Sequence, residues 1–182
     1  MTYAGSMKGA AWAASLLAVY VICTPLGAQT KGDAYLKCKV NPGRAGVFVD
    51  GKYVGPAANF KIARKYALPA GQHEVKLIDP RYEEVTKTVT LVSGMTQVIS
   101  ETLKPVTLVQ GPFGILRTES PDKFAAVYVN GKFYGHSGEF DHGAQGLKLP
   151  PGEYTVRVEP VTGGTPLSQK VTIEAGKMSV VK

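Results

Sequence analysis

The chain has 182 residues and carries 21 basic against 14 acidic side chains, which gives it a formal net charge of +7. This length allows one medium domain or two small ones. An apolar fraction of 44% is ordinary for a globular protein, so it excludes wholesale disorder and a multi-span membrane protein. The 3 His and 2 Cys are too few for a Cys/His-rich metal scaffold or a disulfide framework.

Residues 1–28 differ in character from the rest of the chain. Lys8 is their only charge, and an apolar run from Ala10 to Cys23 is followed by a proline and two small residues that end at Ala28. A charged start, an apolar core and a small-residue exit predict a secretory signal peptide. The run is shorter than the roughly 20 residues that a bilayer-spanning helix needs. We predict cleavage after Ala28, with an uncleaved anchor or a lipid on Cys23 as alternatives.

The first expected strand contains the one cysteine that remains after cleavage. Leu36, Cys38 and Val40 alternate with polar residues, as in a half-buried strand. We expect Cys38 to be buried as a small hydrophobe, and a reactive thiol or an intermolecular disulfide is the alternative. Lys37 and Lys39 then share the opposite face. Such lysines often protect a sheet edge, and they also suit contact with anionic polymers or lipid headgroups.

The remainder of the chain is one motif used twice, with a spacing of about 80 to 82 residues. The matching segments are Val47–Gly55 with Val127–Gly135, Leu68–Gly71 with Leu149–Gly152, and Val85–Leu91 with Leu167–Ile173. Because the spacing changes so little, each insertion must fall in a loop. The sequence therefore predicts two copies of one small unit.

Each unit is expected to consist of strands. Asp50-Gly51 and Asn130-Gly131 lie between alternating apolar residues, and this pattern is a strong signal for a type I′ hairpin turn. Gly or Pro punctuates the other strand-like stretches every eight to twelve residues or so, as in small sandwiches. The predicted fold class is all-β, with two tandem small β-sandwich domains. The predicted domains are 29–103 and 113–182, joined by a linker at 104–112.

At these residues the chain resembles a known family, the PEGA domain. That family has a Pro-Glu-Gly-Ala-like turn, a Val-x-Val-Asp-Gly-Lys hairpin, a Gly-His or Gly-Tyr strand and a closing hairpin. The corresponding segments here are Pro42–Gly46, Val47–Lys52 and Gly71–His73 in the first unit, and Pro121–Ala125, Val127–Lys132 and Gly152–Tyr154 in the second. The resemblance implies a β-sandwich module of exported prokaryotic proteins that is similar to modules of surface-layer proteins. It implies no catalytic residues.

No constellation of side chains in the sequence predicts catalysis. The segment His136–His142 is the only dense cluster of metal-ligating residue types, but the first unit has no ligands at the same place, and this composition is typical of a solvated turn. Ser137, Asp141 and His142 lie in one loop without a nucleophile elbow. Glu83 and Glu84 are adjacent on a strand and point to opposite faces. We therefore predict no enzyme activity, no catalytic or metal-binding residue and no cofactor.

The two hairpins supply the candidate site. A two-residue turn pairs Phe48 with Tyr53 and Val47 with Val54, and cross-strand partners share a face. Valines on one face then form the core, and an aromatic pair on the other face is exposed beside a lysine. The candidate partner or ligand surface is Phe48, Lys52, Tyr53, Tyr128, Lys132 and Phe133. The alternative is that the rings pack under a second sheet or at a contact between the units.

The functional hypothesis is an exported, non-catalytic protein-interaction or structural accessory module of the periplasm or cell surface. A PEGA-like module is usually an appendage, so we expect it to dock on a larger envelope or surface protein, for instance by strand pairing at an open sheet edge. A carbohydrate-binding module for peptidoglycan or exopolysaccharide, using the paired aromatic rings, is the alternative. We expect no nucleic-acid partner. Membrane contact is expected only through an uncleaved signal or the basic surface.

Overall fold

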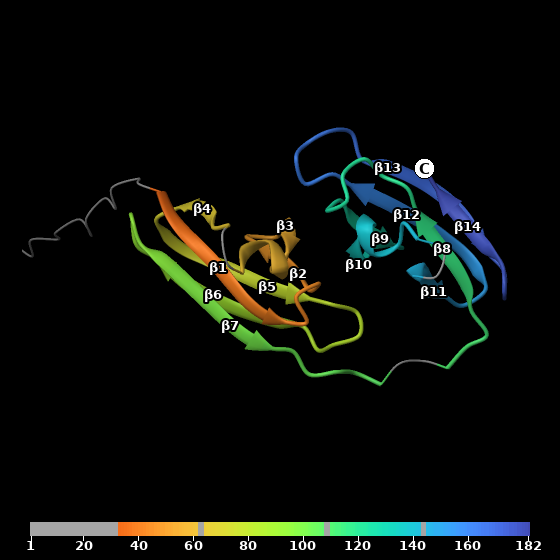
Figure 1. Ribbon diagram of the computed structural model, residues 1–182, viewed down its shortest axis with the longest axis horizontal. Coiled ribbons are helices and arrows are strands. Elements are labelled where there is room, and N and C mark those ends of the chain that lie inside the picture. The colour runs from red at the N-terminus through yellow and green to blue at the C-terminus, as the bar shows by residue number, and fades with distance from the viewer. Residues whose placement is uncertain (1–32, 62–63, 108–109, 143–144) are drawn as a thin grey trace, which may run out of the picture.

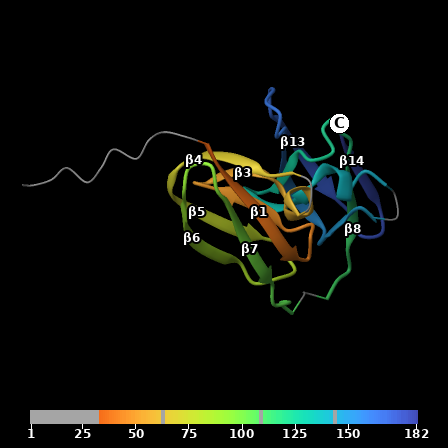
Figure 2. The same ribbon diagram turned by 60° about the vertical axis from the view of Figure 1, so that its left-hand side comes forward.

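The computed structural model describes residues 33–61, 64–107, 110–142 and 145–182 (Figure 1). The predicted signal peptide lies outside these residues. Within them the chain forms two units of seven strands each, which lie side by side in both views (Figures 1 and 2). The prediction of an all-β fold with two small sandwich-like units is confirmed.

The first unit runs from β1 to β7. Its elements are β1 (Asp33–Asn41), β2 (Gly46–Val49), β3 (Lys52–Pro56), the short 3-10 helix η1 (Ala57–Phe60), β4 (Tyr66–Pro69), β5 (Gly71–Ile78), β6 (Val85–Leu91) and β7 (Thr96–Thr102). One sheet has the order β3-β2-β5-β6 and is antiparallel throughout. The other sheet has the order β4-β1-β7, with β1 and β7 parallel.

The second unit repeats this arrangement. Its elements are β8 (Gly114–Thr118), β9 (Ala126–Val129), β10 (Lys132–His136), the 3-10 helix η2 (Ser137–Glu139), β11 (Leu147–Leu149), β12 (Gly152–Glu159), β13 (Leu167–Ile173) and β14 (Met178–Val181). The sheets have the orders β10-β9-β12-β13 and β11-β8-β14, and β8 and β14 are parallel. Each strand of one unit thus has a counterpart in the other, as the sequence repeat predicts.

The hairpin turns have the predicted backbone conformation. Asp50 and Gly51 have φ angles of 50° and 79°, and Asn130 and Gly131 have φ angles of 49° and 79°. Asp, Asn and Gly tolerate this left-handed region better than other residues, so the sequence at these positions selects a type I′ turn.

The predicted hairpin register holds only next to the turn. Phe48 pairs with Tyr53, but Val47 pairs with Gly55 because a bulge at Val54 shifts the register. The expected Val47–Val54 pair is therefore wrong. A bulge inserts one extra residue and re-aims the strand, and the side chain of Val54 still reaches the core of the first unit.

Valines and leucines fill the space between the two sheets of each unit. In the first unit, Val47, Val49 and Val75 from one sheet meet Leu36 and Cys38 of β1. Burial raises the pKa of the Cys38 thiol to about 11, and the expectation that this residue packs as a small hydrophobe is confirmed.

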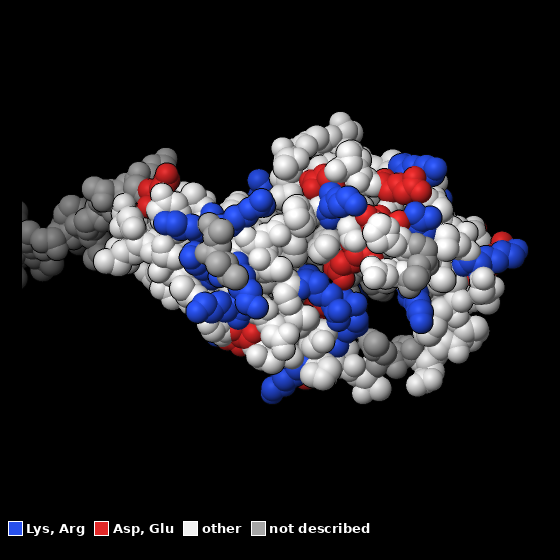
Figure 3. Space-filling view, viewed as in Figure 1, with Lys and Arg blue, Asp and Glu red and all other residues white. Residues whose placement is uncertain are grey.

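The outer face of β1 carries Lys37 and Lys39, as predicted. However, β1 is the central strand of its sheet, between β4 and β7. β4 pairs only with Asp33–Leu36, so at Lys37 and Lys39 the strand pairs with β7 alone and its other side is not paired by β4. Lys65, from the segment before β4, lies on the same side, with its Nζ 4.1 Å from the centre of the Tyr35 ring. Figure 3 shows that Lys and Arg side chains gather on this part of the first unit.

A histidine fixes the hairpin turn of the first unit to the neighbouring strand. The Nδ1 atom of His73 lies 2.6 Å from Oδ2 of Asp50, and its Nε2 atom lies 2.9 Å from the carbonyl oxygen of Pro69. Both partners are acceptors, so both ring nitrogens can donate only in the protonated imidazolium. Burial by itself lowers the pKa of His73, but the bonds to Asp50 and Pro69 outweigh it and raise the pKa above its ordinary 6.5. In the second unit the Tyr154 hydroxyl reaches the carbonyl of Pro150 instead.

Because the first unit has a histidine where the second has a tyrosine, we predict that only the first unit has this pH-dependent contribution to its stability. Because the folded state raises the pKa of His73, its contribution to stability is present below the unfolded pKa of about 6.5 and is lost as the pH rises through the folded value. We expect the unfolding free energy to fall as the pH rises above about 6.5, and His73→Gln to remove this part of the pH dependence. Urea denaturation at a series of pH values measures it. An unchanged slope in His73→Gln would show that the interaction is not coupled to folding.

Candidate functional site

The predicted aromatic surface is a contact between the two units. The β2–β3 hairpin faces the β9–β10 hairpin (Figure 1). The ring of Phe133 packs against both Phe48 and Tyr53 of the other unit, and those two rings also contact each other. The ring centre of Phe133 lies 5.1 Å from that of Phe48 and 5.2 Å from that of Tyr53. These three residues are only 4–7% exposed. The expectation that these rings are exposed is therefore wrong, and they occupy the alternative position, at the contact between the units.

Of the other predicted residues, Tyr128 packs against the aromatic contact, with its ring centre 5.8 Å from that of Phe133. Tyr128 is half-buried, and the guanidinium carbon of Arg157 lies 4.2 Å from the centre of its ring. Lys52 and Lys132 are exposed. Of the six predicted residues, only Lys132 lines the large cleft described below.

A glycine makes room for the inserted ring. A Cβ atom on Gly46 would lie 2.5 Å from the Cζ atom of Phe133, which is too close for any real contact. The corresponding position in the second unit is Ala126, which is fully buried in the same cluster. Gly46 is a sequence signal for the close contact with Phe133, because a glycine inside a strand often marks a place where another group comes close.

An ion network crosses the contact. The buried carboxylate of Asp79, which is 2% exposed, accepts hydrogen bonds from Nε of Arg44 at 2.9 Å and from Nε of Arg81 at 2.8 Å. Arg81 also donates to Oε2 of Glu139 in the second unit, at 3.2 Å. Burial by itself raises the pKa of Asp79, but the bonds from Arg81 and Arg44 outweigh it and hold the pKa below its ordinary 3.8. Sequence reasoning missed this network, because its members are far apart along the chain.

Beside this network, the two units enclose a cleft of about 950 Å³. The first unit contributes two arginines and a proline, and the second contributes Phe113, the β10 strand, part of η2 and the segment from Gln145 to Pro150. The charged lining residues are Arg44, Arg81, Lys132, Lys148 and Glu139. Figure 3 shows the surface hollowed between the units, with Lys and Arg side chains around the opening. Ligand sites commonly form at such contacts between domains.

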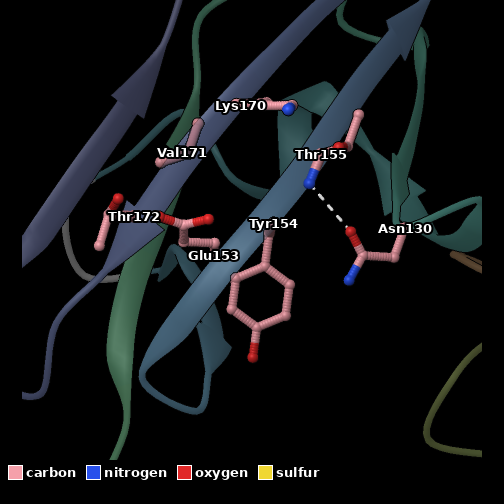
Figure 4. Close-up of a pocket in the computed structure, with 7 residues that line it drawn as sticks. All are labelled: Asn130, Glu153, Tyr154, Thr155, Lys170, Val171 and Thr172. Carbon is pink, nitrogen blue, oxygen red and sulfur yellow. Dashed lines mark hydrogen bonds between the residues drawn. The ribbon is translucent and has the colours of Figure 1, made fainter.

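A second hollow, of about 310 Å³, lies on the second unit alone. Figure 4 shows its lining residues on β12 and β13 and the Asn130 side chain, whose Oδ1 accepts a hydrogen bond of 2.9 Å from the Thr155 amide. Glu153 is the only carboxylate among the lining residues and Lys170 the only cation. This hollow therefore lacks the paired carboxylates or the nucleophile and base that hydrolysis requires.

The histidine cluster near η2 does not converge on one point. His136 lies against the carbonyl oxygen of Lys123 and beside Glu139, whereas His142 is 72% exposed and lies beside Asp141. Within the described parts of the chain, no three His, Cys, Asp or Glu side chains are placed to hold a metal ion.

The comparison with protein families identifies the first unit. The family model of the PEGA domain matches residues 35–107, which begin in β1 and end just beyond β7. The first unit is a PEGA domain. PEGA domains are non-catalytic accessory domains that occur in exported proteins. The second unit lies outside the matched residues and has the same strand order as the PEGA domain.

The wider comparisons add one distant structural neighbour. Among solved structures, the Bacillus anthracis TIE protein is similar, with 18% sequence identity and a TM-score of 0.30. The match covers 84% of this chain and 34% of that protein, so the chain spans about a third of its length. No curated protein matched the chain. No helix in the described ranges is long and apolar enough to cross a membrane.

The aromatic contact predicts that Phe133 stabilises both the PEGA domain and its attachment to the second unit. Phe133→Ala removes the ring that packs against Phe48 and Tyr53, and we expect it to lower the unfolding free energy by about 3 kcal/mol. Phe124→Ala is the matched control, since Phe124 belongs to the same unit but is 38% exposed. Chemical denaturation measures both variants. If both variants lowered the unfolding free energy by the same small amount, the contact would have no structural role.

The ion network predicts that Asp79→Asn destabilises the protein at neutral pH by about 2 to 3 kcal/mol, because the two arginines then face a neutral amide with only one acceptor oxygen. A lowered folded pKa means that the contribution of Asp79 is present above its unfolded pKa and is lost as the pH falls through the folded one. The difference between wild type and Asp79→Asn should therefore narrow toward pH 3 or so. Glu84→Gln is the control, because Glu84 forms an exposed pair with Lys76. A difference that is constant with pH would contradict the assignment.

Proposed function

We propose that this protein is an exported, non-catalytic accessory module that docks on a larger protein of the cell envelope or cell surface. The observation that carries the proposal is the PEGA domain at residues 35–107, because this family consists of accessory domains of exported proteins. The predicted signal peptide at residues 1–28 supports the same location.

The contact between the units supports a binding role for the pair as a whole. Three aromatic rings and the Arg81–Glu139 ion pair hold the PEGA domain against the second unit. Two small units that are fixed in this way present one continuous surface, so a partner can contact both without first ordering them. The cleft of about 950 Å³ lies on that surface. Binding of sugar by the paired rings has no support, since three of the four rings are buried.

The test is crosslinking of the tagged protein in its native host, followed by mass spectrometry of what is captured. The proposal expects one or two envelope proteins to recur at high yield. The same tag on an unrelated exported domain is the control for unspecific capture. Recovery of the protein from the cell-wall fraction with no protein partner would contradict the proposal and favour a wall polysaccharide as the ligand.

The same material tests export. N-terminal sequencing of the protein recovered outside the cytoplasm should give a mature chain that begins after Ala28. A chain that retains residues 1–28 and stays in the cytoplasm would contradict the exported location.

A further inference from the structure

The cleft between the units combines an apolar lining with excess positive charge. Phe113, Tyr134 and Leu147 line it together with four cationic residues and one carboxylate, Glu139. Glu139 is already engaged by Arg81. Such a cleft favours a ligand that has both negative charge and apolar side chains.

Two of the cations have no ion-pair partner among the residues that the structure describes. Arg44 and Arg81 donate to the carboxylate of Asp79, so their charge is partly neutralised. Lys132 and Lys148 are exposed and form no ion pair with any residue in the described ranges. Lys132 stands at the start of β10 and Lys148 in the middle of β11, so they come from the two different sheets of the second unit.

A free strand edge runs along the cleft. β11 pairs with β8 on one side only and is the edge of its sheet, and no other described strand pairs with its second side. Six consecutive residues, from Gln145 to Pro150, line the cleft, so the whole of β11 borders it. An open edge presents backbone donors and acceptors that an extended peptide can pair with.

We propose that this cleft binds an acidic, extended segment of a partner protein, which adds to the edge of β11 while its carboxylates approach Lys132 and Lys148. The inference rests on the proposed function and names the place and chemistry of its docking site. Strand pairing favours a peptide over an acidic polysaccharide, because a polysaccharide has no backbone amides to pair with β11. Apolar side chains of the same segment would then contact Phe113, Tyr134 and Leu147.

The probe is a fluorescent peptide of about nine residues that carries Glu and Val on both faces of the added strand, because Lys132 lies on the side of β11 that faces the other sheet and Lys148 on the outer side. Its binding to the purified protein is followed by fluorescence anisotropy. A peptide with Gln in place of every Glu tests the charge and should bind at least about tenfold more weakly. Peptides with methyl groups on alternate backbone nitrogens test the pairing. Methylation in one of the two registers should abolish binding, and methylation in the other should leave it unchanged.

The protein variants test the location. Lys132→Glu combined with Lys148→Glu should weaken binding of the acidic peptide at least about tenfold. Lys39→Glu combined with Lys52→Glu is the matched control, because it makes the same change in net charge outside the cleft. Lys52 also follows the hairpin turn of the PEGA domain as Lys132 follows that of the second unit. The control should bind within about twofold of wild type.

A second pair of variants keeps the test independent of folding. If melting curves show that the charge reversal disturbs the fold, the double variant Lys132→Gln, Lys148→Gln is used instead. It should also bind the acidic peptide more weakly than wild type and the control variant. Equal binding by the cleft and control variants would overturn the inference. Tighter binding of polygalacturonate than of the acidic peptide, in competition for the same site, would also overturn it and assign the cleft to an acidic polysaccharide.

Crosslinking in cells separates this inference from the proposed function. A partner that is captured equally by wild type and by the Lys132→Glu, Lys148→Glu variant would refute the cleft as its docking site and leave the proposed function standing. Binding of the peptide in the cleft, with no protein partner captured in cells, would refute the proposed function alone.

Discussion

The placement of one aromatic ring decides how the two units are joined. Phe133 packs against Phe48 and Tyr53 of the other unit, over Gly46, whose missing side chain provides the space. Burial of a large apolar side chain contributes about 1.5 to 3 kcal/mol, so this cluster is a substantial part of the stability of two small units. The same contact holds the two units together, and the cleft lies between them beside this contact.

The corresponding hairpins of the two units contribute differently to the contact between the units. In the PEGA domain both hairpin rings, Phe48 and Tyr53, face the second unit and are buried. In the second unit only Phe133 is buried, whereas Tyr128 is partly covered by the side chain of Arg157. The contact is therefore not symmetric: the second unit contributes Phe133, and the PEGA domain contributes Phe48, Tyr53 and the space at Gly46.

Charge is distributed unevenly around this contact. The carboxylates of Asp79 and Glu139 satisfy the arginines at the centre, where burial makes an unpaired charge costly. Lysines at the rim of the cleft remain in contact with solvent and need no such partner. Their charge is available to a ligand at little desolvation cost, as is typical of residues that steer association.

The sequence by itself determined the all-β class, the two-fold repeat and the two hairpin turns, because alternation and turn preference depend on residues that are close along the chain. The same reasoning identified Phe48, Tyr53, Tyr128 and Phe133 as paired rings but not their environment. Only the tertiary structure decided that three of them are buried between the units, that Val54 lies in a bulge, and that Arg44, Asp79, Arg81 and Glu139 form one network. These features depend on contacts between residues that are far apart in the sequence. Local sequence patterns do not predict which distant surfaces come into contact.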